Sequence, residues 1–128
     1  MKKLLYLGIV LMFASCGSSI VNVDGREVST IKIGDLEVMT EDLGDMNWED
    51  AMKTCADLGD GWRLPTNDEL NLLYENKGEI GGFAGNLYWS STEGFNNFVW
   101  SQSFSNGLQF SYSSKKDGSS YVRAVRTI

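Results

Sequence analysis

The chain of 128 residues contains no histidine, one proline and only two cysteines. Without an imidazole, catalytic triads built on histidine and histidine-ligated zinc sites are excluded. The side chain that most often serves as a general base near neutral pH is also missing. The sequence therefore predicts a protein that is not an enzyme, with no cofactor and no metal site.

Positive charge is scarce as well. The chain has 11 Lys and Arg against 17 Asp and Glu, which gives a net charge of −6. A nucleic-acid-binding surface needs clustered basic residues to neutralise phosphates. No nucleic-acid partner is expected, and the acidic surface suits a protein that must stay soluble outside the cell.

The longest apolar run lies at the N-terminus. It extends from Leu4 to Phe13 behind Lys2 and Lys3, has the length of a signal-peptide core and is too short to span a bilayer. The run leads into Phe13-Ala14-Ser15-Cys16. This segment is similar to a bacterial lipobox, in which the lipidated cysteine becomes the mature N-terminus, although Phe13 stands where leucine is usual.

From this signal we expect an exported lipoprotein. Residues 1–15 are expected to be the signal peptide, and Cys16 the lipid anchor in the bacterial outer membrane. Residues 16–23 would form a short tether and 24–128 the folded domain. Two or three acyl chains are enough for stable anchoring. The alternative is an ordinary secretory signal with a chance cysteine.

With Cys16 acylated, Cys55 has no partner for a disulfide within the chain and cannot form a multi-thiolate site. It lies at helical spacing from Trp48, Ala51 and Leu58, on the apolar face of a predicted helix. We therefore expect Cys55 to be a small buried core residue.

Two helices are predicted from their end signals. The first follows Asn47, whose side chain can cap it, and ends near Gly59. The second begins at the capping box formed by Thr66 and Glu69, and ends at Gly78. Both helices carry apolar stripes, so each is expected to cover part of the core.

Arg63 stands just before the second helix, next to the turn that Pro65 fixes. A carboxylate partner is expected for it within the fold. Glu69 and Asp68 both fit, and the sequence does not choose between them.

The remaining chain is predicted to be β-structure. Residues 21–38 alternate loosely around Asp24-Gly25 and Gly34-Asp35, which indicates two short strands. After Gly81 the chain is rich in Gly, Ser, Asn and aromatic residues, with turn signals between short apolar stretches. The strand candidates there are Tyr88 to Ser91, Phe98 to Trp100 with Phe104, Leu108 to Tyr112, and Tyr121 to Val125.

Three blocks occur in a fixed order. They are Gly61-Trp62-Arg63-Leu64-Pro65-Thr66 with Glu69-Leu70, Tyr88-Trp89-Ser90-Ser91-Thr92, and Val122-Arg123-Ala124-Val125-Arg126. Together they resemble C-type-lectin-like domains of bacterial surface proteins: the Fibrobacter succinogenes major paralogous domain and the C-terminal domain of Legionella collagen-like proteins. The resemblance covers residues 24 to 128. It implies an α+β, C-type-lectin-like fold, with two helices packed on a small, mostly antiparallel sheet with long loops.

The chain departs from the family pattern at a few positions. Val38 stands where the family has tryptophan, and Asp42 where it has asparagine. The family often pairs a cysteine at position 55 with one in the final block, where this chain has Ala124. The resemblance therefore implies that this bridge is missing here.

The resemblance implies display of a ligand-binding surface, with an extracellular protein or glycan as partner. Residues 95–121 contain the mixture of Ser, Asn and aromatic residues that antibody loops use for binding. The region also resembles the variable part of retroelement-diversified proteins, in which Trp100, Phe104, Gly107, Arg123 and Arg126 would form a fixed frame. The candidate ligand-binding residues are Asn96, Asn97, Phe98, Ser101, Ser103, Ser105, Asn106, Phe110, Tyr112, Ser113 and Ser114.

Several alternatives stay open at this point. The region can be an ordinary polar hairpin surface, and the protein a structural envelope or pilus-associated subunit. An enzyme of the formylglycine-generating type is disfavoured because its cysteine pair is missing. The acidic loops with Glu41, Asp42 and Asp45, or Asp57 and Asp60, are interpreted as solvated charge rather than as a calcium site.

Overall fold

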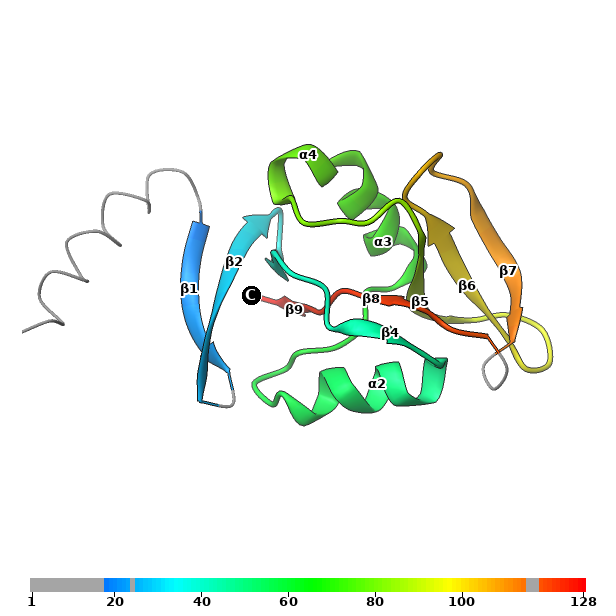
Figure 1. Ribbon diagram of the computed structural model, residues 1–128, viewed down its shortest axis with the longest axis horizontal. Coiled ribbons are helices and arrows are strands. Elements are labelled where there is room, and N and C mark those ends of the chain that lie inside the picture. The colour runs from blue at the N-terminus through cyan, green and yellow to red at the C-terminus, as the bar shows by residue number, and fades with distance from the viewer. Residues whose placement is uncertain (1–17, 24, 115–117) are drawn as a thin grey trace, which may run out of the picture.

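The computed structural model describes residues 18–23, 25–114 and 118–128. Within these residues it has two sheets and three helices, of which one is a single turn (Figure 1). The predicted α+β class is confirmed. The elements are β1 (Ser18–Val23), β2 (Arg26–Ile33), β3 (Leu36–Met39), β4 (Gly44–Met46), α2 (Trp48–Asp57), α3 (Asn67–Glu75), α4 (Lys77–Ile80), β5 (Leu87–Glu93), β6 (Phe98–Ser103), β7 (Gln109–Ser114), β8 (Ser120–Val122) and β9 (Val125–Thr127).

The sheet is divided into two, where a single small sheet was expected. One has the order β1-β2-β3-β9 and the other the order β4-β8-β5-β6-β7. All pairings are antiparallel except that of β5 with β8. The division arises in the last sequence block, where Arg123 and Ala124 separate β8 from β9 and each strand joins a different sheet.

The core lies on two sides of the central strands. Successive side chains of a strand point to opposite faces, so Trp89 and Tyr88 of β5 enter different clusters. Trp89 packs in the cluster that α2 covers, and Tyr88 in the one that α3 and α4 cover (Figure 1). The two helices therefore hold the strands between them.

Both long helices begin where the sequence predicts. The Asn47 side chain accepts a hydrogen bond from the backbone N–H of Asp50 at 2.8 Å. Thr66 and Glu69 form both bonds of the capping box. The predicted end at Gly78 is wrong: α3 ends at Glu75, and Gly78 lies inside the short helix α4. The reason is local, because Asn76 ends one helix and begins the next.

The N-terminal region also differs from expectation. The residues expected to complete the tether, 18–23, form β1, which pairs with β2 over six residue pairs. Val23 is buried, which gives this strand an apolar face to pack. Residues 21–38 thus contribute to three strands rather than two. Cys16 and the expected signal peptide lie outside the described residues.

No helix in the described part of the chain is long and apolar enough to cross a membrane.

Candidate ligand-binding site

The first sequence block is joined to the last by Arg63. Its guanidinium donates to Oε1 and Oε2 of Glu69 at 2.7 and 3.0 Å, so Glu69 rather than Asp68 is the partner. These bonds are the main reason why the pKa of Glu69 is lowered from its ordinary value. The backbones of Arg63 and Val125 exchange two hydrogen bonds, at 2.8 and 2.9 Å. This block therefore has a structural role.

The middle block links the helices to β5. The indole N–H of Trp48, at the start of α2, donates to the carbonyl of Ser90 at 2.9 Å. The backbone N–H of Asn67, at the start of α3, donates to the hydroxyl of Thr92 at 2.8 Å. The register of β5 against β6 shifts between Trp89 and Glu93, which lets the strand reach both helices.

Arg123 of the last block is fully buried. Its Nη1 donates to the carbonyls of Met39 and Gly81 at 2.9 and 3.1 Å, and its Nε donates to Asp42 at 2.9 Å. Asp42 also accepts from the hydroxyl of Tyr88 at 2.7 Å. Burial, and then this bond, raise the pKa of Tyr88 above its ordinary value. The buried charge of Arg123 is thus compensated by a carboxylate and two carbonyls from other segments, which gives Arg123 a structural role.

Arg126 completes what we call the arginine frame, defined as Arg63, Arg123 and Arg126 with their carboxylate partners. Its Nε donates to Glu37 at 2.9 Å, and its guanidinium carbon lies 4.7 Å from the centre of the Trp62 ring. Each arginine thus connects segments that are distant in sequence or fixes the start of a helix. Arg123 and Arg126, which the resemblance places among the fixed positions, both hold segments of the fold together.

Cys55 is buried, as predicted, and burial raises the pKa of its thiol to about 12. It is free. Ala124, at the position where the family resemblance places a second cysteine, lies in the same core cluster. Burial and the raised pKa make Cys55 a packing residue rather than a nucleophile.

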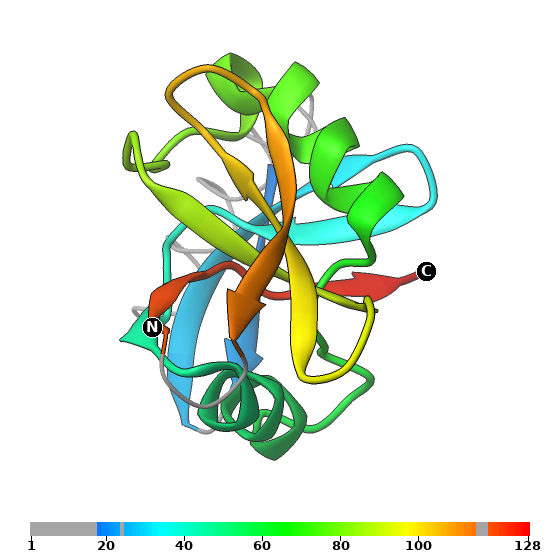
Figure 2. The ribbon, with the colours of Figure 1, turned by 90° about the vertical axis from the view of Figure 1, so that its right-hand side faces the viewer.

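The predicted binding residues do not form one surface. Asn96, Asn97 and Phe98 are exposed at the turn between β5 and β6, whereas Ser105 and Asn106 are exposed at the turn between β6 and β7. The two turns lie at opposite ends of β6 (Figure 2). A strand of this length separates its ends by roughly 20 Å. The exposed members of the predicted set that the structure describes therefore lie at two separate turns.

Two of the predicted residues are not on the surface at all. Ser101 is 0% exposed and Ser103 is 8% exposed, so neither is open to a ligand. Ser101 lies inside β6, between β5 and β7, whereas Ser103 ends this strand, where its hydroxyl lies 2.8 Å from that of Ser105. Phe110 is half-buried on β7. The side chains of Tyr112, Ser113 and Ser114 lie outside the described residues.

The exposed turn carries an open hollow beside it. The hollow has a volume of about 340 Å³, and Phe95 on its rim is 87% exposed. Trp100 reaches it from β6 and is half-buried, whereas Glu93 brings a carboxylate at the end of β5. The lining residues are Glu93, Gly94, Phe95, Trp100 and Ser111.

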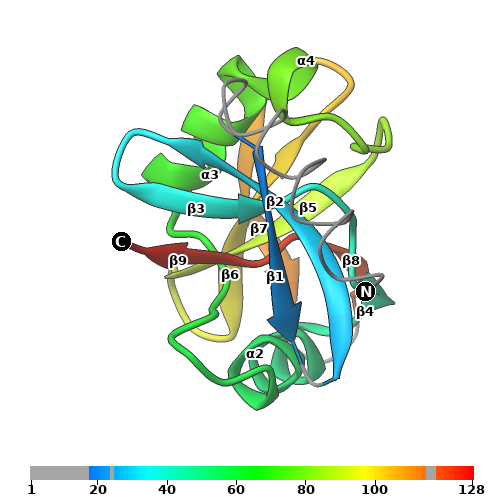
Figure 3. The same cartoon turned by 90° about the vertical axis from the view of Figure 1, so that its left-hand side faces the viewer.

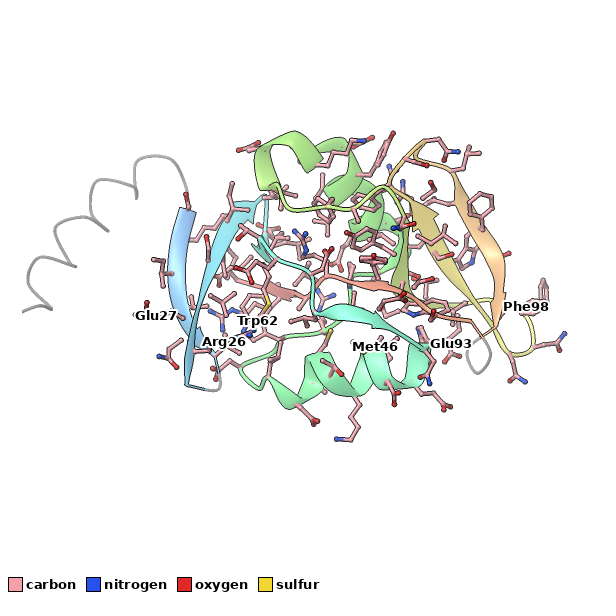
Figure 4. All side chains as sticks on the ribbon, viewed as in Figure 1. Arg26, Glu27, Met46, Trp62, Glu93 and Phe98 are labelled. Carbon is pink, nitrogen blue, oxygen red and sulfur yellow. The ribbon has the colours of Figure 1, made fainter. Side chains whose placement is uncertain are left out.

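The turn itself has a defined backbone. The N–H of Gly94 donates to the carbonyl of Phe98 at 2.9 Å, and the N–H of Phe98 donates to the carbonyl of Phe95 at 3.0 Å. Asn96 adopts a left-handed conformation, with φ of 55°, which asparagine tolerates better than most residues. We call residues 93–98 together with Trp100 and Ser111 the tip surface. Figure 4 places its members Glu93 and Phe98 at one end of the molecule.

The sequence prediction missed Glu93, Phe95 and Ser111, and it placed Trp100 in the fixed frame. A signal for Phe95 was present: it stands between Gly94 and Asn96-Asn97, in a turn where no strand partner could cover a large ring. The alternation of side chains along β6 did not predict that Trp100 lines the hollow, because the register of β6 against β7 shifts between Val99 and Ser101.

A second, smaller hollow is polar. It has a volume of about 160 Å³ and lies beside β4, β5 and β8. Asp45, Asn86 and Ser120 are among its lining residues, with one carboxylate among them. In the described part of the chain no group of three or more metal-ligating His, Cys, Asp or Glu side chains occurs.

Comparison with known protein families matches residues 19–126 to the family described as Lcl C-terminal domain. No curated protein matches the sequence. The family is not a known enzyme family, and the match indicates a surface-associated domain. Since it spans most of the 128 residues and all three sequence blocks, the chain belongs to the Lcl C-terminal domain family.

Proposed function

We propose that this protein is an outer-membrane lipoprotein that displays a ligand-binding domain on the cell envelope. The tip surface binds an extracellular protein or glycan, and the lipid on Cys16 holds the domain at the membrane. No chemical step is assigned to the domain, and nucleic acid is not a partner.

The observation that carries the proposal is the exposure of Phe95 next to Phe98 and Trp100. Phe95 is the most exposed of the large hydrophobic side chains in the described residues. Exposed aromatic rings beside an open hollow contribute little to folding, and they are typical of binding sites because the rings offer contact area at low entropic cost. Glu93 and Ser111 add polar groups that would fix the orientation of a bound ligand.

The arginine frame supports the same function. It fixes the segments behind β5 and β8 through ion pairs of 2.7 to 2.8 Å. A rigid support reduces the ordering that a ligand would otherwise have to impose on the surface. The tip surface is held by backbone bonds of its own, from the N–H of Gly94 to the carbonyl of Phe98 and from the N–H of Phe98 to the carbonyl of Phe95, and these bonds preorganise it for binding.

Ligand capture is the direct test. Cells that display Phe95→Ser or Phe98→Ser should lose capture of the glycan or protein that the wild type retains from an array of immobilised glycans and matrix proteins. Leu108→Ser is the matched control, since Leu108 is 56% exposed but lies at the other end of β6. Equal loss in all three variants, or none in the first two, would contradict a site at the tip.

Anchoring has its own test. Cys16→Ser should release the protein from the membrane fraction into the soluble fraction, because the acyl chains provide the attachment. Unchanged membrane association of this variant would refute lipidation.

Diversification by a retroelement is a narrower form of the proposal. Asn96, Asn97 and Phe98 are compatible with randomised adenine-containing codons and lie on the tip surface, whereas the buried Ser101 and Ser103 are poor positions for variation. The test is genomic: a near-repeat of the 3′ coding segment that differs only at adenines, next to a reverse transcriptase gene. Without that repeat this form is dropped.

The competing function is a structural envelope or pilus-associated subunit. The exposed edge strands β1 and β7 are the features that favour it, since sheet edges can pair with other chains. A homogeneous assembly in detergent extracts would support this alternative over ligand display.

A further inference from the structure

The domain begins unusually close to the expected lipid. Only Gly17 separates Cys16 from Ser18, the first residue of β1. Two residue steps of extended chain span at most about 7 Å. The start of β1 therefore cannot move far from the acylated cysteine.

β1 is itself fixed to the domain. It pairs with β2 along its whole length, from Ser18 opposite Ile31 to Val23 opposite Arg26. Val23 is buried in the core cluster that α2 covers, and Val21 packs against that cluster. Because β1 is held rigidly in the domain, the place of the anchor next to β1 determines how the whole domain is oriented.

The position of β1 decides which side faces the anchor. β1 is the edge strand of its sheet and lies on the side opposite β6 and β7 (Figures 1 and 3). Figure 4 places Arg26 and Glu27 of β2 near this edge and Phe98 of the tip surface at the other end. The anchor and the aromatic turn thus lie at opposite ends of the domain.

The chemistry of the β1–β2 end suits a lipid surface better than that of the helical sides. Ile20 of β1 presents an apolar side chain that is 47% exposed. The exposed charges of β2 and the following turn balance, with Arg26 and Lys32 against Glu27 and Asp35.

Along α2 and the turn after it the exposed charges are mostly acidic: Glu49, Asp50, Asp57 and Asp60 against Lys53. An anionic leaflet repels such a face. The α2 side is therefore disfavoured as the side that lies on the membrane.

We propose that the β1–β2 end rests on the lipid surface and that the tip surface consequently points away from the membrane. The inference deepens the proposed function and rests on lipidation of Cys16. The partner at the β1–β2 end is the headgroup layer of the bilayer that holds the anchor. A ligand can then reach the tip surface without a long linker before the domain, because the domain itself separates the tip surface from the membrane.

Fluorescence quenching tests this orientation. The full lipoprotein is purified with its acyl chains and reconstituted into vesicles of phosphatidylethanolamine and phosphatidylglycerol that contain a nitroxide-labelled headgroup. A dye is attached in separate proteins to Asn22→Cys on β1 and to Asn97→Cys on the tip surface. Both asparagines are exposed, and Cys55 stays unlabelled because its buried thiol has a pKa of about 12.

The dye at Asn22 should lose most of its fluorescence, and the dye at Asn97 almost none. Insertion of a Gly-Ser linker of about 20 residues after Gly17, which lets the ends separate by about 25 Å, should restore the fluorescence at Asn22. Equal quenching at both positions, or quenching that the linker does not change, would overturn the orientation while leaving anchoring intact. Failure of the protein to join the vesicles at all would instead refute the anchor and the orientation with it.

Discussion

The arginine frame and the tip surface differ in where they place side chains that are unfavourable there: the frame buries a charged group, and the tip exposes an aromatic ring. Arg123 is 0% exposed, and its charge is matched by Asp42 and by two backbone carbonyls. Phe95 is 87% exposed. Burying a guanidinium without partners is costly, so the contacts of Arg123 serve the fold. An exposed ring adds little to folding, so the fold alone does not account for Phe95.

The same contrast separates the three sequence blocks of the family from the proposed binding surface. The three sequence blocks contribute bonds between helices and strands, and none of these bonds involves a residue of the tip surface. The turn at 94–97 belongs to none of the blocks. The blocks therefore identify the scaffold, and the proposed binding surface lies on a segment outside them.

The largest effect is expected from Arg123→Met. This change leaves Asp42 without its cationic partner and two carbonyls without a donor, at a cost of about 3 kcal/mol in the free energy of unfolding. The measurement is the urea unfolding midpoint at neutral pH. The double variant Arg123→Met with Asp42→Leu should recover part of the loss, because the unpaired charge is removed as well. A neutral single variant would show that the frame is dispensable.

Gly107→Ala should come next. Gly107 has φ of 84°, and an added Cβ would lie 2.6 Å from the Tyr74 ring. Backbone strain and the ring contact together predict a loss of about 2 kcal/mol. Gly34→Ala is the control, since its φ is also positive, at 60°, but the site is open. If both variants lose equal stability by thermal unfolding, the ring contact does not matter.

Glu69→Gln should cost about 1 kcal/mol near neutral pH, since it weakens the capping box and the pair with Arg63. The pKa of Glu69 is lowered in the folded state from its ordinary 4.5. Its contribution is therefore present above that ordinary value and is lost as the pH falls through the lower, folded value. Unfolding midpoints of wild type and variant should thus converge as the pH is lowered from neutral to well below 4.5. A gap that stays constant on acidification would contradict this account.

The smallest effect is expected at the tip. Phe95→Ser should change the free energy of unfolding by less than about 0.5 kcal/mol, because the ring is almost fully solvated. Val99→Ala, at a fully buried position two residues into the same hairpin, is the contrasting change and should cost about 1–2 kcal/mol. If Phe95→Ser were as destabilising as Val99→Ala, the ring would be part of the core and the comparison between frame and tip would fail.

Much of the fold could be predicted from short stretches of sequence. The helix starts at Asn47 and Thr66 were predictable because each cap is completed within three residues. The burial of Cys55 followed from helical spacing alone. The β-rich C-terminal half followed from its turn residues.

The site was predicted only in part. Asn96, Asn97 and Phe98 are on the tip surface, but Ser101 and Ser103 are covered and Ser105 and Asn106 belong to the far turn. Composition cannot separate these groups, since each of them contains small polar residues, either serine or asparagine. Exposure depends on which other segments cover a side chain, and that depends on contacts between distant parts of the chain.

The sequence by itself determined the local structure: where helices begin, which half is β-rich, and which three blocks mark the family. Only the tertiary structure decided that Arg63 pairs with Glu69, that β8 and β9 join different sheets, and that the aromatic turn lies opposite β1. The physical reason is the distance along the chain between the residues that interact. Caps and turns are completed by hydrogen bonds within a few residues, whereas burial, ion pairing and the direction of a surface depend on contacts between segments that are far apart along the chain.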